Sequence, residues 1–275
     1  AEPPVDLPQK SPGMVLDGPG GGLMSVQGSP EVPPLDDANW PPSSQLLYVM
    51  EGNYRGPIHG EAQVDWLREG DHYQVRLEVR VPPLFTRRML SDGTLGPDGL
   101  VPTRYDQETQ VALQATRRET VRFEGDQVTL GNGKTAERPP GVQDVASQFV
   151  QMTWLFLTRP ERLQPGAVVE FPLALPRRVG RWTYDVRGRE TLELPFGPVD
   201  AVHLQPRAEQ LRPNELNVET WVAPGLLYLP VRIVIRQDAD NYLDLRLRSR
   251  PKVAGPAPAA SGLVPGGAAT GRAGP

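Results

Sequence analysis

The side chains that most often perform covalent or metal chemistry are scarce in this sequence. Its 275 residues include three histidines, His59, His72 and His203, and no cysteine. The lack of cysteine excludes disulfides, thiolate metal sites and thiol nucleophiles. No two histidines have the spacing of a metal motif, and no G-x-S-x-G turn presents a serine nucleophile. The sequence therefore predicts no catalytic residue, no metal site and no cofactor.

Carboxylates are the chemical groups that these patterns leave open. The chain has 33 acidic residues, so a pair that works as general acid and base remains a hypothesis without a preferred position. Asp238, Asp240 and Asp244 in "DADNYLD" are spaced like ligands in a calcium loop. That segment lacks the central glycine and final glutamate of such a loop, so a hairpin turn is the better interpretation.

Aromatic side chains beside arginines indicate binding instead of catalysis. The segment "PPLFTRRML", interpreted as a loop, could cover an apolar ligand that has an anionic head. Two aromatic residues of a predicted helix could line a cavity, although core packing is the more usual role of such residues. A tryptophan in "ELNVETWVAPG" could line a ligand surface or pack beneath the helix, and packing is favoured. The candidate ligand-binding residues are Leu84, Phe85, Arg87, Arg88, Phe149, Trp154 and Trp221.

The charge distribution narrows the range of partners. The formal net charge is −4, and basic and acidic residues alternate along the chain. A nucleic-acid partner is not expected, because it would require a concentrated basic face. No apolar stretch is long enough to span a bilayer as a helix.

Alternation with a period of two dominates from Gln45 onward and predicts antiparallel strands. In "YQVRLEVRV", residues 73 to 81, apolar side chains alternate with polar and charged ones. Residues 62–66, 182–186, 229–235 and 243–247 repeat the pattern, and "EGDH" and "RQDADN" are predicted hairpin turns. We expect ten to twelve strands in a sheet that has one solvated face.

Two segments depart from this alternation. "SDGT" and "GPDG" predict two tight turns around a short strand, and Pro102 is expected at a strand start or on a sheet edge. In "DVASQFVQMTWLFLTRP", apolar residues recur at helical spacing, with Asp144 as N-cap and Pro160 as the stop. The predicted fold is therefore mainly β: a large curved antiparallel sheet, forming a half-barrel or open barrel, with one main α-helix packed on its concave side.

Composition divides the chain into three parts. Residues 1–42 and 251–275 are rich in proline, glycine and alanine and are expected to be disordered, while residues 43–250 form a single β domain. The start "AEPP" is similar to a mature terminus left by signal cleavage, although an arbitrary boundary would look the same. We expect a periplasmic or secreted protein, with a membrane anchor upstream of this sequence as an alternative.

The order of motifs resembles a known family. "YRGPIHGEA", "DGLVPTRY", "QDVASQFVQMTW", "GRETLELPFGPVDAVHL" and the closing Trp-x8-Pro-Val-x-Ile of "VETWVAPGLLYLPVRIVI" look like the bacterial envelope family known as domain of unknown function 3108. The closing element is also similar to lipoprotein carriers of the Lol type. That second resemblance implies an incomplete antiparallel barrel with helical lids over an apolar cavity. The first resemblance implies an exported protein of a Gram-negative bacterium.

Together these observations favour a non-catalytic protein of the cell envelope. The leading hypothesis is that it binds or carries an apolar or amphiphilic ligand, such as a lipid, or contacts an envelope protein. A structural or scaffold protein with a filled core is the alternative. A carboxylate-dependent enzyme that acts on an envelope polymer is the third hypothesis.

Overall fold

The computed structural model describes residues 40–207 and 217–254. The terminal segments that were predicted to be disordered lie outside these ranges, apart from residues 40–42 and 251–254. No helix in the described residues is long and apolar enough to cross a membrane.

One sheet of 16 strands organises the described residues. Its spatial order is β8-β7-β6-β5-β4-β3-β2-β1-β15-β14-β13-β12-β11-β10-β9, and β16 pairs with β1. The strands are β1 (Ser44–Asn53), β2 (Pro57–Glu69), β3 (His72–Val81), β4 (Phe85–Gly96), β5 (Gly99–Val111), β6 (Arg117–Glu124), β7 (Gln127–Thr129), β8 (Thr135–Glu137), β9 (Gln143–Asp144), β10 (Val168–Leu175), β11 (Arg178–Leu194), β12 (Gly197–Pro206), β13 (Asn217–Ala223), β14 (Leu229–Arg236), β15 (Tyr242–Leu247) and β16 (Lys252–Val253).

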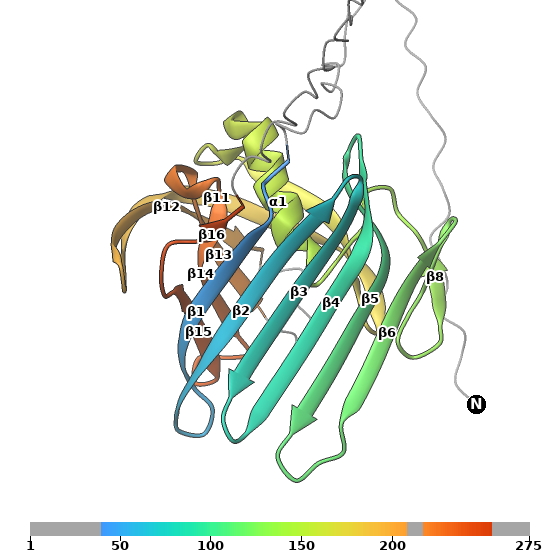
Figure 1. Cartoon of the computed structure of the whole chain (residues 1–275), viewed down its shortest axis with the longest axis horizontal. Helices are drawn as coiled ribbons and strands as arrows, with labels where there is room; N and C mark the ends of the chain where they lie inside the picture. The colour runs from blue at the N-terminus through green and yellow to red at the C-terminus, as the bar shows by residue number, and fades with distance from the viewer. Residues whose placement is uncertain (1–39, 208–216, 255–275) are drawn as a thin grey trace, which may run out of the picture. The chain divides into compact units, whose positions relative to one another are not determined.

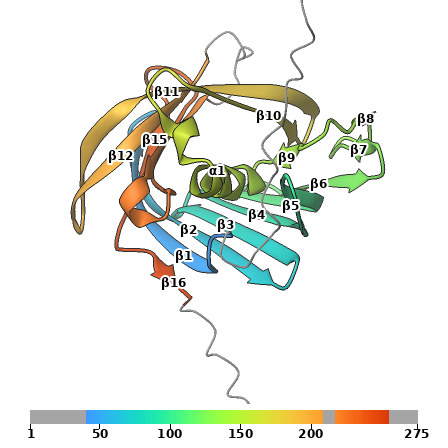
Figure 2. The same cartoon turned by 90° about the horizontal axis from the view of Figure 1, so that it is seen from above.

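The sheet curves around a single α-helix, α1 (Ser147–Thr158). Figure 1 shows β1 to β6 as a broad face with α1 behind it, and Figure 2 shows α1 surrounded by the curved strands. All strand pairs are antiparallel except β9–β10. The sheet does not close into a barrel, so the predicted fold class, a curved antiparallel sheet with a helix on its concave side, is confirmed.

Alternation of side chains explains why the sheet has two different faces. Along β3, Tyr73, Val75, Leu77, Val79 and Val81 are buried, and the residues between them are partly or fully exposed. The buried side chains form the concave face around α1, and the others form the outer face. Sixteen strands were found where ten to twelve were predicted, because β7, β8, β9 and β16 are too short to show any period.

The helix is buried around most of its circumference. Of the predicted apolar stripe, Met152 and Phe156 are buried, and Phe149 packs against both core clusters. Hydrogen bonds tie α1 to both halves of the sheet: Gln151 Oε1 accepts from the N–H of Leu100 at 2.8 Å, and the Tyr184 hydroxyl donates to Gln148 Oε1 at 3.3 Å. The concave side is therefore filled by side chains and helix.

Asp144 holds the start of the helix against β4. Its Oδ1 accepts hydrogen bonds from the N–H groups of Ala146 and Ser147 at 2.9 and 2.8 Å, and the Ser91 hydroxyl donates to Oδ2 at 2.6 Å. The N-cap position belongs to Ala146 and not to Asp144 as predicted, so the helix begins two residues later than expected, and Asp144 accepts from the N-cap residue and the first helical residue. The α-helix ends at Thr158, and Pro160 begins the 3₁₀ helix η2 (Pro160–Leu163). A second 3₁₀ helix, η4 (Pro224–Leu226), follows β13.

One of the two predicted turns is wrong. "GPDG" forms the β4–β5 turn, but "SDGT" lies inside β4, where the register shifts between Asp92 and Gly93. A Cβ atom at Gly93 would lie within 2.3 Å of the Val101 carbonyl oxygen, so glycine is required here by a close strand approach. Pro102 pairs only with β4, because β6 pairs with β5 from Arg104 onward. Pro102 thus lies on a local sheet edge, as expected.

The beginning and the end of the described strands meet. Ser44 and Gln45 of β1 pair with Val253 and Lys252 of β16. The N–H of Ala254 also donates to the carbonyl oxygen of Ser43 at 2.8 Å.

The buried carboxylate of Asp144 gives a pH-dependent stability. Burial raises its pKa to about 6, although bonds from Ser91 and Ser147 oppose the rise. The pKa in the unfolded chain is about 4, so the folded protein binds the extra proton between these values. We expect the free energy of unfolding to fall by about 2–3 kcal/mol as the pH rises from 4 to 7 through this group.

Substitution of Asp144 by Asn tests this expectation by urea unfolding at several pH values. The amide keeps an acceptor for the helical N–H groups and cannot ionise, so the D144N variant should lose this part of the pH dependence. An unchanged pH profile in D144N would show that another group is responsible.

Candidate functional site

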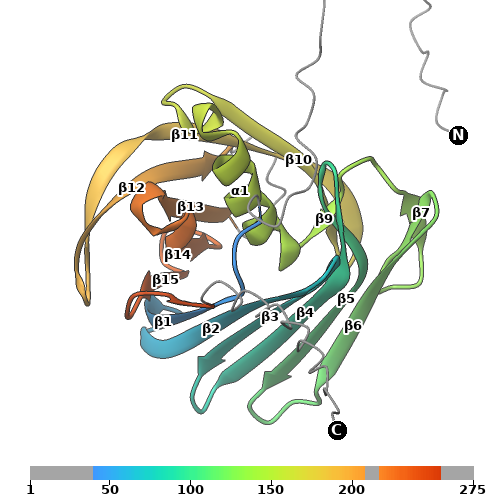
Figure 3. The ribbon, with the colours of Figure 1, turned by 45° about the horizontal axis from the view of Figure 1, so that its top comes forward.

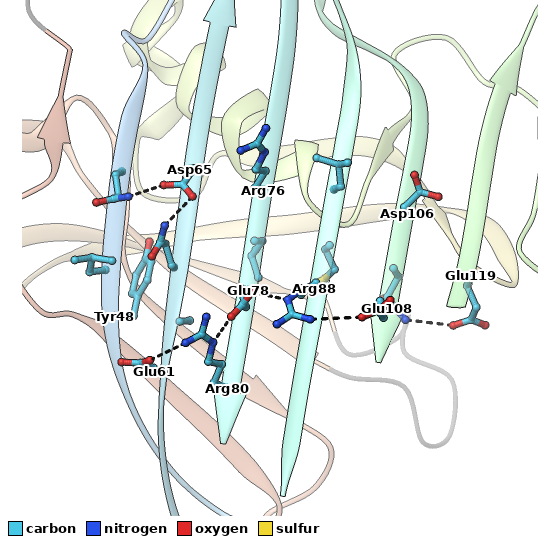
Figure 4. A pocket seen from close by; sticks show the side chains of 18 of the residues that line it. Tyr48, Glu61, Asp65, Arg76, Glu78, Arg80, Arg88, Asp106, Glu108 and Glu119 are labelled. Atoms are coloured by element: carbon cyan, nitrogen blue, oxygen red, sulfur yellow. Dashed lines mark hydrogen bonds and ion pairs between the residues drawn. The ribbon is translucent and has the colours of Figure 1, made fainter. Parts of the chain in front are cut away.

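The largest hollow lies on the outer face of β1 to β6 and is called the outer trough below (Figure 4). Its volume is about 800 Å³, and it is open to solvent. Acidic side chains and arginines alternate along it. On the outer face they are Glu61, Asp65, Glu78, Asp106 and Glu108, and Arg76, Arg80, Arg88, Arg104, Arg118 and Arg248.

A row of ion pairs crosses the trough from β2 to β6. The strand register places Glu78 opposite Arg88, Arg88 opposite Glu108, and Glu108 opposite Arg118, so opposite charges are neighbours on one face. The nitrogen–oxygen distances of these three pairs are 2.7, 3.5 and 2.7 Å. Arg80 extends the row by pairing with Glu78 and, at 3.7 Å, with Glu61.

Hydrogen bonds from arginines lower the pKa of two carboxylates in the trough, Glu78 and Asp106. Partial burial raises the pKa of Glu78, but hydrogen bonds from Arg88 and Arg80 outweigh burial and hold that pKa below its usual value. For Asp106, bonds from Arg104 and Thr120 outweigh burial in the same way and lower the pKa. A general acid needs the opposite shift, so neither carboxylate is prepared to donate a proton near neutral pH.

Two arginines of the trough differ from the rest. The Nε of Arg76 donates to Gln74 Oε1 at 2.7 Å, while the nearby Asp65 carboxylate accepts from the side-chain amides of Gln45 and Gln63. Within the part of the chain that the structure describes, neither Arg76 nor Arg248 pairs with a carboxylate. These two cations are the groups of the trough most available to a partner.

A smaller hollow, called the seam pocket below, lies between α1 and β10 beside the β4–β5 turn. Its volume is about 190 Å³. Apolar and polar side chains line it together. The apolar ones are Met152, Trp154, Leu155, Val168, Val169 and Phe171, and the polar ones are Asp98, Gln151, Arg159, Arg162 and Glu170.

Trp154 of the seam pocket also packs against the first described residue. Its ring stacks on Trp40 with ring centroids 5.3 Å apart and an interplanar angle of 23°. Both indole N–H groups are buried, and neither has a hydrogen-bond partner in the described part of the chain. A buried donor without an acceptor is costly.

The candidate residues from "PPLFTRRML" lie at different places: one is in a turn, and the others lie in β4 with side chains on both faces of the sheet. Leu84 is exposed in the β3–β4 turn, whereas Phe85, Arg87 and Arg88 belong to β4 and not to a loop. Arg87 lies on the concave face, opposite the buried residues Val79 and Thr109. Its neighbour Arg88 points to the outer trough.

The other predicted residues occupy three different environments. Phe149 packs between the two core clusters, and Trp154 lines the seam pocket. Trp221 is 6% exposed and belongs to the core cluster that also contains Val150 and Trp154 of α1. Its ring stacks on His203 at 4.1 Å and lies under Arg232 at 4.7 Å, and its N–H bonds to Glu190. The seven predicted residues therefore do not converge on one site.

Most residues of the two hollows were not singled out in the sequence. Leu155, Arg159 and Phe171 come together only because α1 packs beside β10. The charges of the trough were recognisable as a solvated strand face, but their ion pairs depend on the register of five strands. Of the seven candidate residues, Arg88 lines the outer trough and Trp154 lines the seam pocket.

The fold places the chain among β-barrel-like proteins in which the sheet does not close. The chain belongs to the family described as protein of unknown function (DUF3108), whose sequence pattern matches residues 48–246. This confirms the family resemblance seen in the motifs.

Two solved structures of other families are similar to the chain. A β-barrel-like protein of domain of unknown function DUF1849 from Brucella abortus shares 11% identity and a TM-score of 0.51, over 78% of this chain and 99% of that one. A DUF1329 family protein from Desulfovibrio piger has 11% identity and a TM-score of 0.31, over 82% and 89% of the two chains. The first likeness supports the fold alone. None of the curated proteins compared with the chain matches it.

The ion pairs of the outer trough should contribute little to stability. Glu78 pairs with two arginines at a partly exposed site, and exposed pairs are worth about 1 kcal/mol or less. We expect Glu78→Gln to lower the free energy of unfolding by less than about 1 kcal/mol, and by less still at high salt.

Urea unfolding at low and high sodium chloride concentration measures this effect. Glu61→Gln, at the end of the row, is the matched control and should change stability less than Glu78→Gln. A loss of several kcal/mol in Glu78→Gln would instead make the row a structural element of the sheet.

Proposed function

We propose that this protein is a non-catalytic binding protein of the bacterial cell envelope, and that it holds the apolar end of an amphiphilic molecule in the seam pocket. The observation that carries the proposal is the composition of this pocket. Apolar side chains of α1 and β10 line it together with charged side chains, and the buried Trp154 indole N–H has no acceptor within the described residues.

The size of the pocket defines how much of a ligand it accommodates. Pockets that enclose a whole small molecule measure about 300–1,000 Å³. The seam pocket, at about 190 Å³, therefore suits one end of a longer molecule. Because α1 fills the concave side, the proposed ligand lies in the seam pocket between α1 and β10 and not in a central cavity of the sheet.

Two further observations support the non-catalytic and envelope parts of the proposal. Asp144, whose pKa is raised to about 6, is fully buried and bonded to Ser91 and Ser147, and so it is sealed from any substrate. The pKa values of Glu78 and Asp106 in the outer trough are shifted in the opposite direction. The family resemblance described above supports a periplasmic or secreted location.

A probe with a fluorescent head tests binding at the seam pocket. We expect 11-(dansylamino)undecanoic acid to bind the full chain and Val168→Trp to weaken binding about tenfold, since the larger ring would occupy the pocket that Val168 lines. Val101→Trp is the matched control, because Val101 is also a strand valine, with 38% exposure against 39% for Val168. Val101 lies outside the lining of the pocket.

Equal affinity in both variants would remove the seam pocket from consideration, and absence of binding to the native chain would contradict the proposal as a whole. Native mass spectrometry of gently purified protein should also show a bound amphiphile that is depleted in Val168→Trp.

The outer trough supports a second candidate function, contact with an envelope protein by a scaffold with a filled core. The supporting observation is a hollow of about 800 Å³ whose Arg76 and Arg248 have no carboxylate partner in the described residues. A photo-crosslinking amino acid at Leu90, inside the trough, should capture a defined partner in cells, while the same amino acid at Val101 should not. Equal labelling at both positions would contradict this function.

A further inference from the structure

The concave face of β4, β5 and β6 becomes polar with distance from α1. Three rows of cross-strand neighbours show the change. The row nearest the helix start is Ser91, Tyr105 and Val121; the next is Met89, Gln107 and Glu119; and the last is Arg87, Thr109 and Arg117. The last row thus places two guanidinium groups on either side of one threonine, on a face that elsewhere forms the core.

Three arginines gather around one carboxylate at this end of the face. The Nε of Arg117 lies 3.6 Å from Oε2 of Glu119, and the Nε of Arg177, from the β10–β11 turn, lies 3.7 Å from Oε1. Gln107 also donates to Oε2 at 3.2 Å. Arg87 is close enough to interact electrostatically with both Arg117 and Glu119. Three positive groups against one negative group leave two positive charges unbalanced.

Arg87 is the least satisfied member of this group. Its Nε donates to Thr109 Oγ1 at 3.2 Å, and its guanidinium lies 5.3 Å from the centre of the Phe85 ring. Within the described ranges it forms no ion pair with a carboxylate. Burial lowers the pKa of Arg87, and the charge of Arg117 lowers it further. A partly buried cation beside a like charge is unfavourable unless an anion joins it.

The arginines also lie where two distant parts of the sheet meet. The N–H of Gly131, in the β7–β8 turn, donates to the carbonyl oxygen of Pro176 at 2.8 Å. Pro176 and Arg177 form the β10–β11 turn, while Arg87 and Arg117 belong to β4 and β6. A ligand held by all three arginines would therefore join these parts of the sheet.

We propose that Arg87, Arg117 and Arg177 form a binding site for a phosphate-type oxyanion. Such a group carries one to two negative charges at neutral pH and so offsets the excess positive charge of the cluster, and guanidinium groups bind it with paired hydrogen bonds. Thr109 and Gln107 supply polar neighbours on the same face. The site shares no residue with the seam pocket, so it stands or falls independently of the proposed function.

Titration of the full chain with inorganic phosphate, followed by calorimetry and thermal unfolding, tests the site. Sodium chloride of equal ionic strength provides the background. We expect phosphate to bind and to raise the unfolding temperature, and Arg87→Gln to weaken binding about tenfold or more. Arg88→Gln is the matched control, since the same change one residue later falls on the outer face and should leave binding unchanged.

Arg177→Gln is a second test of the site, for the case that Arg87→Gln impairs folding. The Arg177 side chain is 71% exposed in a turn, so this variant should fold normally and still bind phosphate more weakly. Equal phosphate affinity in the native chain, Arg87→Gln and Arg177→Gln would overturn the proposal. The same effect of phosphate and chloride on the native chain would also overturn it.

A vesicle experiment identifies the source of the oxyanion. If the natural ligand is a lipid headgroup, the native chain and Arg88→Gln should sediment with phosphatidylglycerol vesicles but not with phosphatidylcholine vesicles, and Arg87→Gln should not sediment. If the ligand is a free anion, phosphate binds and vesicles do not. Both results support the site. Vesicle binding that is equal in Arg87→Gln and Arg88→Gln, together with no phosphate binding, contradicts it.

Discussion

A buried carboxylate must receive hydrogen bonds, and Asp144 receives them where β4 and the first turn of α1 meet. Its two oxygens join Ser91 to the N–H groups of Ala146 and Ser147, so this contact sets where the helix enters the curved sheet. From that position α1 fills the concave side and reaches both halves of the sheet (Figure 3). The hollows that remain lie at the seam beside the helix and on the outer face.

The pleat of the sheet gives neighbouring residues opposite roles. Arg88 points outward into a row of alternating charges, where water and salt reduce the value of each pair. Arg87, one residue earlier, points inward to a partly buried position without a carboxylate partner in the described residues. The same residue type, arginine, thus contributes solubility on the outer face and an unbalanced positive charge on the concave face. The difference follows from burial and partners alone.

Local patterns were sufficient to predict most of the fold. The alternation in β3, β14 and β15 and the helical spacing in α1 depend on neighbours in sequence, so they are visible without a structure. The "SDGT" segment was misinterpreted because glycine and aspartate favour turns, while Gly93 is required by a strand that approaches it from afar. Trp221 was expected to pack beneath the helix or to line a ligand surface. It is buried in a core cluster that contains residues of α1, and its ring lies between His203 and Arg232, whose positions depend on strand pairing. The seam pocket and the arginine cluster likewise require contacts between residues far apart in sequence, and no local pattern encodes them.

The pairing of β16 with β1 has a mechanical consequence. The chain enters the sheet at Ser44 and leaves it at Val253, and these two residues face each other in an antiparallel pair. A pull between the two ends would load this pair together with the Trp40–Trp154 stack, and it would open the pair one set of hydrogen bonds at a time instead of shearing many at once. The sheet beyond β16 would therefore bear little tension while this short strand peels away. An attachment before Ser44 and an attachment after Val253 would therefore hold the sheet at the same position, the β1–β16 pair.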